Sequence, residues 1–157
     1  MQIRNVRESD FDPIISVLDA WWGGRNMAAM LPKLFFRHFN ETSFTAEVKG
    51  DPAGFLIGFI SNTYLDEAYI HFLGVHPDHR KNGIGRALYE RFFEISRQKK
   101  KTVIRSVTSP VNQNSIAFHL HMGFEMEPAI EQSGDIPVHR NYDGPGEDRV
   151  LFIKKFF

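Results

Sequence analysis

The sequence contains no cysteine at any of its 157 positions. This absence excludes disulfide bonds, cysteine-ligated metal sites and a cysteine nucleophile. It also contains no run of eighteen apolar residues, and no apolar signal segment precedes the strand-like residues Gln2–Val6. We therefore expect a cytoplasmic protein that does not associate with membranes.

An excess of charge of one sign is also absent. The 19 basic and 19 acidic residues cancel, so the overall charge does not favour nucleic acid as a partner, and any basic patch must be local. A hydrophobic content of 42% over 157 residues is enough for one core and too little for two. The expected organisation is a single domain spanning residues 1–157.

The pattern of apolar residues predicts alternating helices and strands in the order β-α-α-β-β-β-α-β-α-β-β. This order indicates a mixed α/β fold with helices on both faces of a largely antiparallel sheet. Helices are predicted after Asp10 as far as Gly23 and over 27–38, 84–101 and 114–122. Strands are predicted over 3–6, 43–48, 54–61, 67–75, 102–108, 124–126 and 149–156, with a weak one near Val138.

The most informative stretch joins the end of the strand at 67–75 to a glycine-bearing turn and then to a helix. The first amides of a helix lack internal partners and carry the positive end of its dipole, so such a turn suits phosphate. Two glycines permit close approach of the backbone, and three cations surround the turn. The residues of this predicted diphosphate cradle are Arg80, Lys81, Asn82, Gly83, Ile84, Gly85 and Arg86.

Two motifs together resemble the GNAT superfamily of acyl-CoA N-acyltransferases. The first is Arg80-x-x-Gly83-x-Gly85 after Leu73-Gly74-Val75, and the second runs from Asn112 to Gly123-Phe124. The resemblance covers essentially the whole chain and is most specific over residues 67–124. It implies a GNAT-like fold in which two neighbouring parallel strands, 67–75 and 102–108, splay apart to admit the pantetheine arm.

The resemblance also implies an activity, the transfer of an acetyl group from acetyl-CoA to a primary amine. Attack on the thioester would be direct and would pass through a tetrahedral intermediate. Backbone amides at a bulge over Leu73, Gly74 and Val75 would stabilise the developing negative charge on the carbonyl oxygen. The expected acceptor is a small-molecule or peptide amine, and the sequence leaves a homodimer open.

His119 stands where the family often has a tyrosine that assists the leaving thiolate. A neutral imidazole is a weak acid but can donate a hydrogen bond to a nascent thiolate. The alternative is a structural histidine in the wall of a cleft. His119 is therefore a candidate both for catalysis and for contact with the cofactor.

Two residues compete for the role of the base that removes the amine's proton. By alternation Glu67 and His71 share a strand face with Tyr69 and Leu73. A glutamate following Asp66 at a strand end is more often a solvated turn residue. Water can also take this role in the family.

Asn112 could bind the pantetheine amides or cap the following helix, and the two roles are compatible.

Trp21 and Trp22, which are adjacent to each other in the sequence, could form an aromatic wall for the acceptor or pack in the core. The turn-rich segment 141–148 carries three carboxylates that would favour a cationic amine if it overhangs the acceptor, and otherwise is a solvated loop.

Other classes of function fit the sequence less well. His119 and His121 lie two apart on a predicted helix and cannot chelate together, and His76 and His79 lack further ligands, so no metal is expected. A dinucleotide fingerprint fails because Leu88 occupies the position of its third glycine. The serious alternative is a GNAT-like module that binds acyl-CoA without turnover, as a sensor or interaction domain.

Overall fold

The computed structural model describes residues 1–156. The chain divides into two compact units, the first formed by Met1–Ile60 and Ile70–Lys99 and the second by Ser61–Tyr69 and the residues from Lys100 onward. The assignment of the whole chain to one domain stays a prediction.

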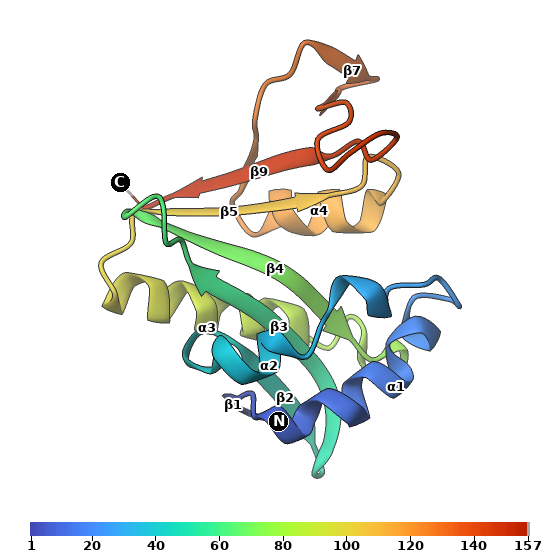
Figure 1. Ribbon diagram of the computed structural model, residues 1–157, viewed down its shortest axis with the longest axis vertical. Coiled ribbons are helices and arrows are strands. Elements are labelled where there is room, and N and C mark those ends of the chain that lie inside the picture. Colours follow the sequence, from blue (N-terminus) through green and yellow to red (C-terminus); the bar gives the residue numbers. More distant parts are fainter. Residues whose placement is uncertain (157) are drawn as a thin grey trace. The chain divides into compact units, whose positions relative to one another are not determined.

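The first unit contains most of the helices (Figure 1). Its elements are β1 (Gln2–Asn5), η1 (Glu8–Asp10), α1 (Phe11–Trp21), η2 (Ala28–Met30), α2 (Leu34–His38), η3 (Asn40–Thr42), β2 (Phe44–Val48), β3 (Asp51–Ile60), the larger part of β4 (Glu67–Val75), η4 (Pro77–His79) and α3 (Ile84–Gln98).

The second unit contains the first three residues of β4 and the rest of the described chain. Its other elements are β5 (Val103–Thr108), α4 (Gln113–His121), β6 (Glu125–Met126), β7 (Glu131–Ser133), β8 (Ile136–Val138) and β9 (Val150–Lys155).

The strands form one seven-stranded sheet in the order β1-β2-β3-β4-β5-β9-β6, and β7 and β8 form a separate hairpin. The pairs β1–β2, β2–β3, β5–β9 and β6–β9 are antiparallel, whereas β4 and β5 are parallel. The parallel ladder joins residues 67–69 to residues 103–105, at the start of each strand. The predicted mixed α/β fold, with a mostly antiparallel sheet and one parallel pair, is confirmed.

In the first unit, both faces of β3 pack against helices. Phe55 and Ile57 join the buried cluster that includes Leu18 of α1 and Phe36 of α2. The opposite face carries glycines, and a Cβ atom on Gly58 would lie 2.4 Å from the Phe92 ring of α3. Gly54 and Gly58 thus let α3 pack closely against the strand (Figure 1).

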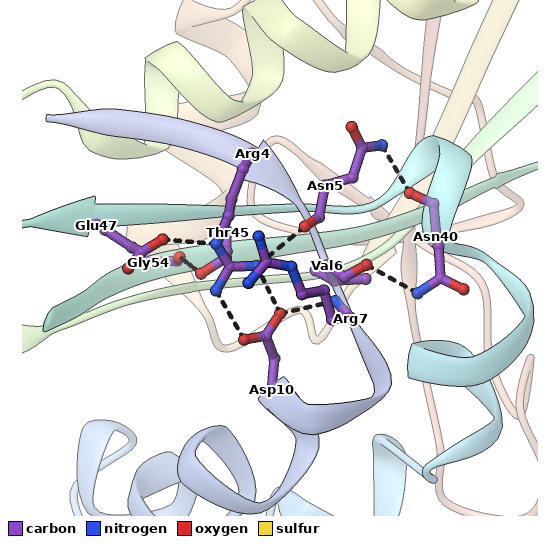
Figure 2. Close-up of polar contacts among 9 residues, drawn as sticks. All are labelled: Arg4, Asn5, Val6, Arg7, Asp10, Asn40, Thr45, Glu47 and Gly54. Carbon is purple, nitrogen blue, oxygen red and sulfur yellow. Dashed lines mark hydrogen bonds and ion pairs between the residues drawn. The ribbon is translucent and has the colours of Figure 1, made fainter. Parts of the chain in front are cut away.

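Arg4 ties β1 to the start of the first helical segment. Its guanidinium bonds both carboxylate oxygens of Asp10, at 2.8 and 2.9 Å, and its Nε donates to Glu47 of β2 at 2.6 Å. The Asp10 carboxylate also accepts the Arg7 amide (Figure 2). The Asp10 side chain therefore caps the short 3-10 turn η1, which precedes α1.

The region predicted as one helix over 27–38 is instead two short helices, η2 and α2. Pro32 lies between them, and proline both lacks an amide hydrogen and disfavours helical geometry at the preceding residue. The predicted helix over 84–101 ends earlier, at Gln98, and Lys100 adopts a left-handed conformation with φ of 62°. The β7 strand was not predicted.

Candidate functional site

In the first unit, β4 ends at Leu73, Gly74 and Val75, the residues predicted to hold the pantetheine and the carbonyl. A Cβ atom on Gly74 would lie 2.4 Å from the Phe55 ring and 3.1 Å from the Trp22 indole. Glycine is therefore required here by close packing.

Two aromatic residues of β4 just before Gly74 pack against the helical segment of the first unit. The rings of His71 and Phe35 of α2 stack at 4.5 Å, and Phe72 packs on Trp22 at 5.2 Å. Burial along β4 alternates regularly from Glu67 to Val75. The predicted bulge over 73–75 stays a prediction.

The turn after β4 leads into α3 through a left-handed glycine. Gly83 is the N-cap residue with φ of 79°, and apart from its own chain neighbours and the adjoining helix backbone no heavy atom of residues 1–156 lies within 4 Å of where its Cβ would be. No side chain caps the first turn of α3 within residues 1–156. The amides at the start of this 15-residue helix therefore lack a side-chain partner, as the predicted phosphate cradle requires.

The cations of the cradle differ in what they contact. Arg86 forms an exposed ion pair with Glu90 one helical turn later, at 2.8 Å. Lys81 is exposed and adopts a left-handed conformation with φ of 68°. The Arg80 guanidinium is directed to backbone carbonyls, with Nη2 donating to Trp21 and Nε to Val75. Arg80 is thus already engaged by the protein.

His71 is held in one tautomer by its backbone partner. Its Nε2 lies 2.7 Å from the Met30 carbonyl oxygen, which can only accept, so Nε2 carries the proton. In the neutral ring Nδ1 is then the basic nitrogen. A histidine oriented in this way has the arrangement expected of a general base.

In the second unit, Glu67 is paired with a cation. Its carboxylate accepts Nε of Arg105 at 2.6 Å, and the same guanidinium bonds Glu127 at 2.7 Å. The sequence did not anticipate Arg105 as a neighbour, although the parallel register of β4 and β5 brings the two strands together. The Glu67 carboxylate is therefore already engaged by a cation of the protein.

His119 is buried, with 5% of its surface exposed, and its ring stacks on Phe152 at 4.3 Å. Nδ1 lies 2.8 Å from the Ser115 carbonyl oxygen and so carries the proton, which leaves Nε2 as the unprotonated nitrogen. Burial lowers the pKa of His119 to about 4, although the bond to Ser115 acts in the opposite direction. This geometry favours the structural role over that of a proton donor.

Asn112 caps α4. Its side-chain oxygen accepts the Ser115 amide at 3.1 Å, which is the capping role that the sequence proposed as an alternative. Gly123 follows the helix with φ of 89°, as expected of a residue that ends a helix. A cofactor contact of Asn112 stays a prediction.

The three carboxylates of segment 141–148 form ion pairs with two arginines. Asp143 and Glu147 pair with Arg149, and Asp148 pairs with Arg140. These ion pairs reduce the attraction that the segment would exert on a cationic amine.

Tyr69 lies near this segment, because Tyr142, Asp143 and Arg149 all act on its phenol. Burial raises the pKa of Tyr69 to about 12, with Tyr142 and Asp143 acting in the same direction and Arg149 against it. The phenol is therefore neutral at ordinary pH.

Within residues 1–156, no three histidine, aspartate or glutamate side chains gather in an arrangement that could hold a metal ion. None of the helices in the same residues is long and apolar enough to cross a membrane.

The family model and one relative that match this chain are both named as acetyltransferases. The model of the acetyltransferase (GNAT) family matches residues 7–124. An uncharacterized N-acetyltransferase of Methanocaldococcus jannaschii is 28% identical over 141 residues, which are 82% of this chain and 62% of that protein. The chain thus spans about three fifths of the length of this relative.

Solved structures share the fold. Ard1 from Thermoplasma volcanium superposes with a TM-score of 0.80 at 20% identity, covering 99% of this chain and 97% of that one. A putative acetyltransferase from Salmonella typhimurium, solved with its cofactor acetyl-CoA, gives a TM-score of 0.70 at 18% identity, with 100% and 94% coverage.

Proposed function

Because the chain belongs to the GNAT acetyltransferase family, we propose that it transfers the acetyl group of acetyl-CoA to a primary amine. The observation that carries the proposal is the uncapped N-terminus of α3 behind the left-handed Gly83. Open space over Gly83 and unpaired first-turn amides suit a diphosphate, and the Salmonella structure shows that this fold can hold acetyl-CoA. We take the whole of residues 1–157 as the acetyltransferase domain.

The residues that would hold the cofactor follow from the cradle. The amides from Gly83 to Arg86 would bind the diphosphate, with Lys81 as an exposed cation beside them. Leu73, Gly74 and Val75 would supply backbone groups to the pantetheine and to the carbonyl. Acetyl-CoA provides a thioester, whose carbonyl carbon the neutral amine attacks to form a tetrahedral intermediate.

We assign the removal of the amine's proton to His71 rather than to Glu67. The Met30 carbonyl fixes the His71 tautomer that leaves Nδ1 basic, whereas Glu67 is paired with Arg105. His119 is assigned to packing, because its protonated nitrogen is bonded to the Ser115 carbonyl. A thiol with an ordinary pKa near 8.5 can depart as the thiolate without a dedicated acid.

The acceptor is proposed as a small-molecule or peptide amine in the cytoplasm. The relatives leave its identity open, and the pairing of the 141–148 carboxylates removes the argument for a strongly cationic acceptor. The competing function is a module that binds acyl-CoA without turnover, which would need the cradle but no base.

Thiol release tests the proposal with little background, since the chain itself contains no cysteine. The protein would be incubated with acetyl-CoA and a panel of amino acids, polyamines, aminoglycosides and peptides, and free coenzyme A followed with a thiol reagent. We expect at least one amine to accelerate thiol release. Binding of acetyl-CoA with no acceleration by any amine would favour the non-catalytic module.

A further inference from the structure

The carboxyl end of α1 lacks a cation of its own. No basic residue lies in its last turn, although a helix C-terminus carries partial negative charge. The carbonyls of Asp19 and Ala20 accept the amides of Trp22, Gly23 and Gly24. The Trp21 carbonyl receives the Arg80 guanidinium instead, from 59 residues further along the chain.

We propose that Arg80 is a positioning residue that fastens the end of α1 to the turn between β4 and α3, and that it is not a diphosphate ligand. A second bond, from Nε to the Val75 carbonyl at 3.4 Å, orients the guanidinium at the root of that turn. Arginine suits this task because its planar donors can serve two carbonyls at once.

The two tryptophans lie where Arg80 fastens the helix. Trp21 packs on His76 at 5.3 Å and on Phe55 at 6.1 Å, next to the turn. Trp22 packs on Phe72 at 5.2 Å. Both indoles therefore depend on the end of α1 staying close to the end of β4.

The same segment continues to the proposed base. The Asp19 carboxylate accepts the amides of Met27 and Ala28, at 2.8 and 3.0 Å, and the Met30 carbonyl accepts His71. Arg80 thus holds the near end of a segment, residues 22–30, whose far end orients His71. The consequence for catalysis rests on the proposed function; the fastening itself does not.

Tryptophan fluorescence tests the fastening directly, because Trp21 and Trp22 are the only tryptophans of the chain. Acrylamide quenching would be measured in the free protein for the wild type, Arg80→Gln, Arg80→Lys and Arg86→Gln. Arg86 is the matched control, since its partner is the exposed Glu90. We expect Arg80→Gln to raise the quenching constant by about twofold, with Arg80→Lys in between and Arg86→Gln unchanged.

Coenzyme A titration of the same proteins separates the two roles of Arg80. A positioning residue leaves coenzyme A affinity within about threefold of the wild type, whereas loss of a direct phosphate contact would weaken it about tenfold or more. With the amine found in the panel, we expect kcat/KM for the amine to fall about tenfold in Arg80→Gln while KM for acetyl-CoA stays nearly constant.

The proposal is overturned if quenching in Arg80→Gln equals that of the wild type, or if coenzyme A affinity falls tenfold while kcat/KM for the amine holds. If Arg80→Gln loses its far-UV circular dichroism signal, the variant is unfolded and Arg80→Lys is used in its place. The proposal is then contradicted if Arg80→Lys shows the same quenching as the wild type and also binds coenzyme A weakly. Failure of the wild type to bind coenzyme A would refute the proposed function and leave the fluorescence result standing.

Discussion

His119 is a buried imidazole whose ionisation is linked to folding. In the folded protein it binds a proton only below about pH 4, whereas in the unfolded chain a histidine does so below about pH 6.5. Between these values the unfolded state holds more protons, so the free energy of unfolding falls as pH falls. A difference of this size corresponds to about 3 kcal/mol lost once the pH is below 4.

The variant His119→Phe isolates this effect, because phenylalanine can stack on Phe152 without titrating. We expect the difference in unfolding free energy between wild type and variant, from urea melts at pH 7 and pH 4.5, to shift in favour of the variant at the lower pH. We also expect kcat to stay within about threefold of the wild type. If the unfolding free energies of wild type and variant changed in parallel with pH, the lowered pKa of His119 would be contradicted. A collapse of kcat alone would restore His119 as a catalytic candidate.

His71 is the residue on which the chemical step depends most in this account. In His71→Gln the amide nitrogen can still donate to the Met30 carbonyl, but no group can accept a proton at the Nδ1 position. We expect kcat to fall by about 100-fold or more, with KM for acetyl-CoA unchanged, in the thiol-release assay. The matched variant Glu67→Gln should lose less than about tenfold. The opposite ranking would assign the base to Glu67.

Gly74 links the packing of β3, β4 and α1. A Cβ atom there would overlap the Phe55 ring, so Gly74→Ala should lower the unfolding free energy by about 1–3 kcal/mol. Replacing Phe55 with leucine in the same chain should recover part of this loss, which a double-mutant cycle in urea would measure. Strict additivity of the two substitutions would mean that the clash is relieved elsewhere.

Some elements were predictable because their signals are local. The β4 strand has the predicted bounds, since alternation and flanking turns define it from both sides. The β7 strand was missed because all three of its residues are exposed, so no apolar alternation marks it. The helical region after α1 was predicted as continuous because its apolar pattern outweighed the effect of Pro32.

The site was predictable only where backbone conformation decides it. Gly83 and the helix start after it follow from glycine content and helix signals. The partners of Arg80, Glu67 and His119 did not follow, because each lies at a long sequence separation or depends on burial. Charge in a motif indicates a site but does not show which charges are already paired.

At the scale of the whole chain, the single-domain prediction implies one cooperative unfolding transition. Tryptophan fluorescence reports on the first unit alone, since both indoles lie there, whereas far-UV circular dichroism reports on both units. We expect the two thermal melting curves to coincide. Midpoints that differ by several degrees would mean that the two units unfold separately.

The most direct test of the central claim is calorimetric titration of acetyl-CoA into the wild type, Gly83→Glu and Gly50→Glu. Gly50 is the matched control, because its φ of 82° is close to the 79° of Gly83 and both positions face open space, but Gly50 lies in the β2–β3 turn. We expect binding by the wild type and by Gly50→Glu, and none by Gly83→Glu, whose carboxylate repels the diphosphate. Equal binding by all three proteins would contradict the claim that the start of α3 holds the cofactor.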